Sequence, residues 1–225
     1  MKQSKLPAAA VLLLAAVLGT GAVLAQAPIK DKEYALVEPP QPTNSGGKVE
    51  VIEFFFYGCP HCYNLQPTLM KWQKTMPKDV DFKRIPTIFR DTWVPMARAF
   101  YAMEAAGVLD KLHHDLFIAI HEQRNERLLN DKAAFLDWAA AKGADRKKLE
   151  DAYDSFAVQT KTQRAVQLTK LYGITGTPSV VVDGKYLTAP GMTLNANHEV
   201  DYDRFTKVLN ELIAGARKEH AAKKG

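Results

Sequence analysis

The sequence contains only two cysteines, Cys59 and Cys62, in a C-x-x-C spacing. Thiols at this spacing can exchange a disulfide with another protein or supply two ligands to a metal ion. A structural disulfide stabilises a protein chiefly by closing a long loop, and this pair would close almost none. The spacing therefore favours redox chemistry over a structural crosslink.

A zinc site would need two further ligands at a spacing that matches the pair. No such paired spacing is found among the histidines His113, His114, His121 and His198. We therefore expect no metal and no separate cofactor. The redox group would be the Cys59–Cys62 disulfide itself.

The residues around the pair predict that Cys59 begins a helix. Residues 48–57 are β-branched, aromatic and nearly all apolar, which is typical of a strand covered on both faces. Gly58 ends this strand, and Pro60 suits the first helical position because its missing N–H costs nothing there. Cys59 would then lie where unpaired N–H groups and the helix dipole favour a thiolate.

His61, between the two cysteines, would stabilise the thiolate further if its imidazole donates a hydrogen bond or carries a charge. A stabilised thiolate stabilises the reduced protein, so the disulfide becomes a stronger oxidant. We expect Cys62, one turn into the helix, to be buried and to act on Cys59 rather than on solvent.

Glu53 is the only acid between residues 51 and 57. Strand alternation places it on the face of Val49, Val51 and Phe55, where burial would raise the pKa of its carboxyl. A structural ion pair is one interpretation, with Arg84 or Lys83 as the partner.

The elements that must position these residues follow in the order β-α-β, several helices, then α-β-β-α, which indicates an α/β sheet. The middle of the chain, residues 91–158, is too long for a crossover and should pack as its own lobe. Predicted strands are 48–57, 79–89, 179–182 and 185–188, and predicted helices are 60–76, 95–106, 109–121, 131–142, 145–156, 159–172 and one that begins at 201.

The two ends of the chain differ from this core. Residues 1–27 have the layout of a cleavable secretory signal peptide, with cleavage after Ala25 or Ala27, and an uncleaved membrane anchor is the alternative. Residues 28–47 predict an extended arm. The basic tail comprises residues 216–225, and the chain is expected to fray from residue 215 onward.

The composition excludes other classes of protein. The chain has 225 residues, of which 47% are hydrophobic and 24% charged, which is typical of a globular protein and not of a disordered one. The net charge of +5 comes without a dense basic stripe, so we expect no nucleic-acid binding. A cleaved signal would deliver the chain to a compartment where disulfides persist.

Taken together, the export signal, Cys59-Pro60-His61-Cys62 between a strand and a helix, the helical stretch, and Gly176-Thr177-Pro178 before a strand resemble the thiol:disulfide interchange protein DsbA family. The resemblance covers about residues 45–215. It implies a thioredoxin fold with an inserted all-helical domain. The thioredoxin-like parts would be residues 48–90 and 159–215, and the insertion residues 91–158.

The family resemblance also implies a function and its partners. The protein would be a monomeric oxidase of the bacterial periplasm that introduces disulfide bonds into unfolded exported proteins. A DsbB-like membrane quinone reductase would reoxidise it.

Site residues carry over from the family by position. Pro178 would be a cis-proline that faces the cysteine pair, and Thr177 would pair with a substrate strand and place its hydroxyl near the Cys59 sulfur. Many members have Val where this chain has Thr177. Glu53 would correspond to a buried acid that shuttles protons for Cys62.

Two other functions stay open from the sequence. A disulfide reductase or isomerase could use the same fold, although His61 and the absence of a dimerisation segment in residues 28–47 argue against it. A non-enzymatic peptide-binding chaperone, whose cysteines only lock the fold, is the alternative from another class.

Overall fold

The computed structural model describes residues 27–223, so the predicted signal peptide lies outside the described residues except for Ala27. A five-stranded sheet, ordered β1-β5-β4-β2-β3, forms the centre of the thioredoxin-like part. Strands β2 and β3 are parallel, and the other pairs are antiparallel. The strands are β1 (Ala35–Leu36), β2 (Val49–Phe55), β3 (Val80–Pro86), β4 (Ser179–Val182) and β5 (Tyr186–Thr188).

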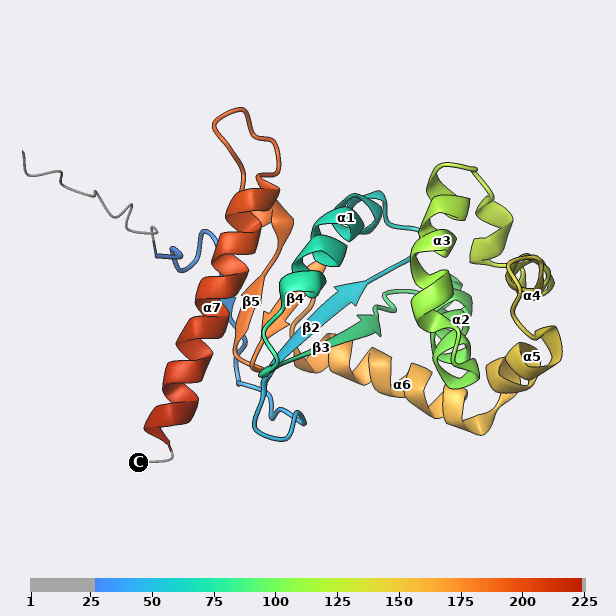
Figure 1. Ribbon diagram of the computed structural model, residues 1–225, viewed down its shortest axis with the longest axis horizontal. Coiled ribbons are helices and arrows are strands. Elements are labelled where there is room, and N and C mark those ends of the chain that lie inside the picture. The colour runs from blue at the N-terminus through green and yellow to red at the C-terminus, as the bar shows by residue number, and fades with distance from the viewer. Residues whose placement is uncertain (1–26, 224–225) are drawn as a thin grey trace, which may run out of the picture.

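Helices stand in two groups around this sheet. Helices α2 to α5 follow β3 in the chain and form a lobe beyond the end of β2, as Figure 1 shows. The helices are α1 (Pro60–Thr75), α2 (Val94–Ala106), α3 (Leu109–His121), α4 (Lys132–Ala141), α5 (Arg146–Asp154), α6 (Phe156–Leu171) and α7 (Tyr202–Ala222). This is the predicted α/β thioredoxin fold with an inserted helical region.

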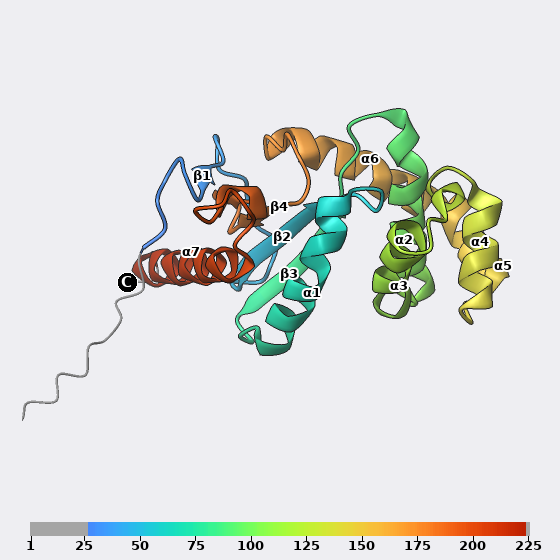
Figure 2. The same cartoon turned by 90° about the horizontal axis from the view of Figure 1, so that it is seen from above.

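Strand β2 carries the core on both of its faces, and all seven of its residues are buried. Val49 and Val51 pack in one hydrophobic cluster with α1 and α7. Ile52 and Phe54 pack in a second hydrophobic cluster, which includes Tyr172, the residue just after α6. Figure 2 shows α6 and α1 on opposite sides of the sheet. An apolar strand is stable here because neither face meets water.

Most helix ends follow the capping chemistry that the sequence predicts. The side chains of Asp131, Asp145 and Asp201 each accept a hydrogen bond from the backbone N–H three residues later. One boundary was predicted wrongly, because α5 ends at Asp154 and α6 begins at Phe156. Ser155 has extended backbone angles and caps the new helix at Val158 N, so it separates the two helices.

The C-terminal prediction was also wrong, because α7 continues to Ala222 where we expected fraying from residue 215. Two contacts hold its last turns to the β4–β5 hairpin. Lys185 forms a salt bridge with Glu219 at 2.6 Å, and His220 Nε2 lies 2.9 Å from the Asp183 carboxylate. Ala216 is fully buried beneath these turns. Tertiary contacts therefore order a segment whose composition predicts fraying.

The N-terminal arm contributes strand β1, which the sequence analysis missed, at the edge of the sheet beside β5. The arm is held by the buried Glu33 carboxylate, which pairs with Arg204 of α7 at 2.6 Å. Within residues 27–223, no helix has the length and apolar character needed to cross a membrane.

Candidate active site

The two cysteines lie at the start of α1, directly beyond the buried strand β2. Cys59 is the N-cap residue of α1, with extended backbone angles, and Pro60 occupies the first turn as predicted. Cys59 is half-buried and Cys62 is fully buried, and both are free thiols. Substrate can therefore reach only the first sulfur, as the sequence predicts.

The two thiols have opposite pKa shifts. The pKa of Cys59 is lowered to about 5, chiefly by a hydrogen bond from the Cys62 thiol and further by the Thr177 side chain and the backbone N–H groups of Cys62 and His61. Burial raises the pKa of Cys62 well above its ordinary value. At neutral pH the pair therefore consists of an accessible thiolate and a buried thiol that donates to it.

Thr177 and Pro178 face the cysteines from a distant part of the sequence. When Cys59 is protonated, its thiol donates to the Thr177 carbonyl oxygen, with Sγ and O 3.3 Å apart. The Thr177–Pro178 peptide bond is cis, as the family resemblance implies. These two residues and the cysteine pair thus form one site, and β4 begins directly after them.

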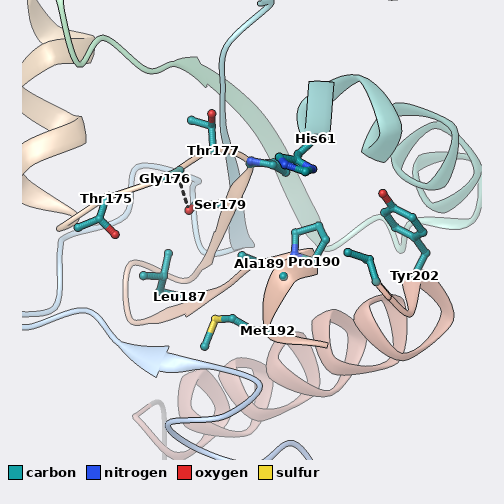
Figure 3. A pocket seen from close by; sticks show the side chains of 13 residues that line it. His61, Thr175, Gly176, Thr177, Ser179, Leu187, Ala189, Pro190, Met192 and Tyr202 are labelled. Atoms are coloured by element: carbon teal, nitrogen blue, oxygen red, sulfur yellow. Dashed lines mark hydrogen bonds between the residues drawn. The ribbon is translucent and has the colours of Figure 1, made fainter. Parts of the chain in front are cut away.

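A cavity of about 400 Å³ extends from this site along the segment before β4 and the segment after β5 (Figure 3). His61 lies at one end of it. The cavity wall is mostly apolar, and the residues that line it include Thr177, Pro178, Leu187, Pro190, Met192, Val200 and Tyr202. Such a wall suits an extended apolar peptide segment rather than a charged ligand.

His61 and Pro60 are the exposed members of the C-P-H-C motif. The contribution of residue 61 to the lowered pKa of Cys59 comes from its backbone N–H. A stabilising role for the His61 imidazole stays a prediction.

Glu53 belongs to β2, and its completely buried carboxylate lies between the sheet and α1. Its Oε2 accepts a hydrogen bond from Arg84 Nε at 2.9 Å, and its Oε1 accepts one from Gln66 Nε2 at 3.1 Å. Burial outweighs these partners and raises the pKa of the carboxyl. Its negative charge contributes to the raised pKa of Cys62. Glu53 is therefore electrostatically coupled to the buried thiol.

The structure decides which cation pairs with Glu53. The parallel register of β2 and β3 sets Arg84 directly beside Glu53. Lys83 points to the opposite side of β3, where it binds Glu50 at 2.6 Å and Asp81 at 3.1 Å. Of the two partners that the sequence left open, Arg84 is the correct one.

Gln66 was not singled out from the sequence, and His113 and His121 were considered there only as possible metal ligands. Gln66 follows Cys62 by four residues, and its Nε2 also donates to the Cys62 carbonyl at 3.3 Å. A polar residue on the buried face of α1 was a signal that could have been read. His113 and His121 of α3 bind Tyr57, and no local pattern indicates that these segments meet.

In the part of the chain that the structure describes, no group of three or more His, Cys, Asp or Glu side chains could hold a metal ion.

Comparisons with known proteins agree with this geometry. The family description "DSBA-like thioredoxin domain" matches residues 81–201. The chain is 46% identical to the thiol:disulfide interchange protein DsbA of Burkholderia cepacia over 181 residues, covering 78% of this chain and 84% of that protein. It is 40% identical to the protein of the same name from Bordetella pertussis over 209 residues, covering 92% and 96%.

Solved structures show the same relationship. The crystal structure of Pseudomonas aeruginosa DsbA superimposes with a TM-score of 0.78 at 35% identity, covering 88% of this chain and 97% of that one. Sequence and structure therefore agree over nearly the whole described chain. This chain belongs to the DsbA family of thiol:disulfide interchange proteins and is a protein-disulfide oxidoreductase.

Proposed function

We propose that this protein acts as an oxidase, which introduces disulfide bonds into unfolded exported proteins at Cys59 and Cys62. The observation that carries the direction of the reaction is the lowered pKa of Cys59, about 5. At neutral pH the reduced protein is stabilised as a thiolate, whereas the disulfide gains no such stabilisation. Electrons therefore flow from substrate thiols to this protein.

The exchange has two steps. A substrate thiolate attacks Cys59 Sγ, which forms a substrate–Cys59 disulfide, breaks the Cys59–Cys62 bond and releases Cys62 as a thiolate. The second substrate thiolate then attacks the substrate sulfur and expels the Cys59 thiolate, which is a good leaving group because of its low pKa. The substrate loses two electrons and two protons, and this protein is reduced to the dithiol.

Glu53 would supply and accept the proton of Cys62. A Cys62 thiolate released in the interior requires a proton, because its pKa is raised well above the ordinary value. Glu53, buried, with a raised pKa and electrostatically coupled to Cys62, would be the proton donor, and Gln66 holds its carboxyl beside α1 by donating to both Glu53 Oε1 and the Cys62 backbone carbonyl.

Substrate would bind along the apolar cavity beside Thr177 and Pro178. In the oxidised protein that meets substrate, Cys59 has no thiol proton to donate, so the Thr177 carbonyl is free to accept from a substrate backbone. The apolar wall would make recognition broad. Among the site residues, His61 and Pro60 would contact substrate from the exposed end of α1.

The cellular setting is part of the same proposal. A signal peptide at residues 1–27 would export the chain to the periplasm, where it would act as a monomer with no cofactor beyond the Cys59–Cys62 disulfide. A DsbB-like membrane quinone reductase would reoxidise it. We propose residues 48–90 and 159–215 as the thioredoxin-like domain and 91–158 as the insertion, with 28–47 as the arm.

Equilibrating the purified protein with glutathione redox buffers tests this function. A reduced form that persists in oxidising buffer would support the oxidase. A disulfide that resists reduction would overturn it and favour a reductase, an isomerase or a structural bond. Cys59→Ala should abolish substrate oxidation, whereas retained activity on unfolded clients would indicate a peptide-binding chaperone.

A further inference from the structure

The segment that carries the cysteines is held by the inserted lobe at several points. We call residues Phe56–Tyr63 the redox loop. The Phe56 ring stacks on Trp93, which precedes α2, with ring centres 3.8 Å apart and an angle of 3° between the planes. Contacts with Tyr57 and Tyr63 come from α3. Because the cysteines lie between these contacts, the lobe can set the geometry of the reacting sulfurs.

His121, at the end of α3, contacts one residue on each side of the cysteine pair. Its Nε2 donates to the Tyr57 carbonyl oxygen at 2.8 Å, two residues before Cys59. A carbonyl can only accept, so the proton must lie on Nε2. The same ring stacks on Tyr63, the residue after Cys62, with ring centres 5.1 Å apart and planes 16° from parallel.

Neighbouring contacts on α3 fix these two tyrosines further. Tyr57 is completely buried, and its hydroxyl lies 2.7 Å from His113 Nδ1. The Tyr63 hydroxyl donates to Glu122, the residue that follows His121. Helix α3 and Glu122, directly after it, therefore hold the residue before Gly58 and the residue after Cys62.

We propose that His121 is a positioning residue for disulfide exchange, which from the inserted lobe holds the Tyr57 carbonyl and the Tyr63 ring in one fixed arrangement around the cysteines. This role rests on the proposed exchange at Cys59 and Cys62. It does not depend on the direction in which that exchange runs.

The reactivity of Cys59 depends on how the hydrogen-bond donors around its sulfur are oriented. The thiolate is stabilised by the Cys62 thiol and by the backbone N–H groups of His61 and Cys62, all within the redox loop, and by the Thr177 side chain from outside it. If His121 no longer donates, the Tyr57 carbonyl loses its partner, and the loop must shift to recover one. A shift of the loop turns those donors away from the sulfur and weakens the thiolate.

Substituting His121→Phe separates the hydrogen bond from the stacking, because the phenyl ring can still stack on Tyr63 but cannot donate. We expect the pKa of Cys59, followed by thiolate absorbance, to rise by about one unit, and the glutathione equilibrium to become about tenfold less oxidising. His121→Gln keeps a donor and should stay within about threefold of the wild type.

His114→Phe is the matched control, because His114 lies on the same helix but lines the cavity beside Met70 and Lys74 instead of contacting the redox loop. It should leave both quantities unchanged. The proposal is overturned if His121→Phe stays within about twofold of the wild type while the oxidised protein melts normally, or if His114→Phe shifts the equilibrium equally.

If His121→Phe does not fold, Tyr63→Leu removes the stacking partner and leaves His121 in place. It should shift the equilibrium by at least about threefold, and an unchanged constant would overturn the proposal. The equilibrium constant of the wild type judges the oxidase function by itself. The ratio of the variant's equilibrium constant to that of the wild type tests the role of His121. A failure of the oxidase function and a failure of the His121 proposal are therefore distinguishable.

Discussion

The lowered pKa of Cys59 predicts how the stability of the reduced protein depends on pH. The pKa falls from an ordinary value of 9.0 to about 5 on folding. A group whose pKa is depressed by folding contributes stability that is lost as the pH falls through its folded value. The reduced protein should therefore lose stability as the pH falls from 7 to 4.

The size of the effect follows from the two pKa values. At pH 7 an unfolded thiol is still protonated, and the folded Cys59 is about two pH units above its own pKa. Each unit is worth about 1.4 kcal/mol, so the thiolate contributes at most about 3 kcal/mol at pH 7, because water screens the half-exposed sulfur, and nearly nothing at pH 4. For this two-electron couple, that stabilisation corresponds to at most about 60 mV of additional oxidising potential at pH 7.

Urea unfolding of the reduced and the oxidised protein, measured side by side from pH 4 to pH 8, checks this prediction. The oxidised protein is the matched control, because it contains every other titrating group but no thiolate. The difference in unfolding free energy, reduced minus oxidised, should grow by between about 1 and 3 kcal/mol from pH 4 to pH 7. Cys59→Ser has no disulfide and no thiolate at position 59, so its unfolding free energy should follow the pH dependence of the oxidised wild type.

A difference that changes by less than about 1 kcal/mol over this range would refute the reasoning. The thiolate would then be no more stable in the folded protein than in the unfolded chain. The same result would remove the observation on which the oxidase function rests.

Two further substitutions test the buried acid and the β4–β5 turn. Glu53→Gln removes a carboxyl whose pKa is raised by burial, so its stabilising contribution fades as the pH rises above 4.5. In urea unfolding of the oxidised proteins, the unfolding free energy of the variant should increase relative to that of the wild type as the pH rises. A decrease with rising pH would show that the Arg84 ion pair outweighs the effect of burial on the pKa of Glu53. Gly184→Ala should cost about 2 kcal/mol by thermal unfolding, because φ is +66° and the new Cβ would lie 2.0 Å from the Gln41 carbonyl oxygen. Gly191→Ala, with open space around it, should change little, and equal losses in the two variants would contradict this account.

Local chemistry in the sequence predicts much of this protein. The apolar run before Gly58, the proline after Cys59 and the capping acids Asp131, Asp145 and Asp201 each act on residues within a few positions. Their elements appear in the structure within a few residues of the predicted bounds. The reactive cysteine and its buried partner follow from the same local reasoning, because a helix N-terminus is defined by its own first turn.

Contacts between distant segments needed the tertiary structure. Arg84 rather than Lys83 pairs with Glu53 because the register of two parallel strands decides which neighbour shares its face. The last turns of α7 are ordered by Asp183 and Lys185, which composition alone does not indicate. His121 contacts the loop before Cys59 across 64 positions of sequence. Periodicity and capping describe each element alone, and which side chains meet depends on how the whole chain packs.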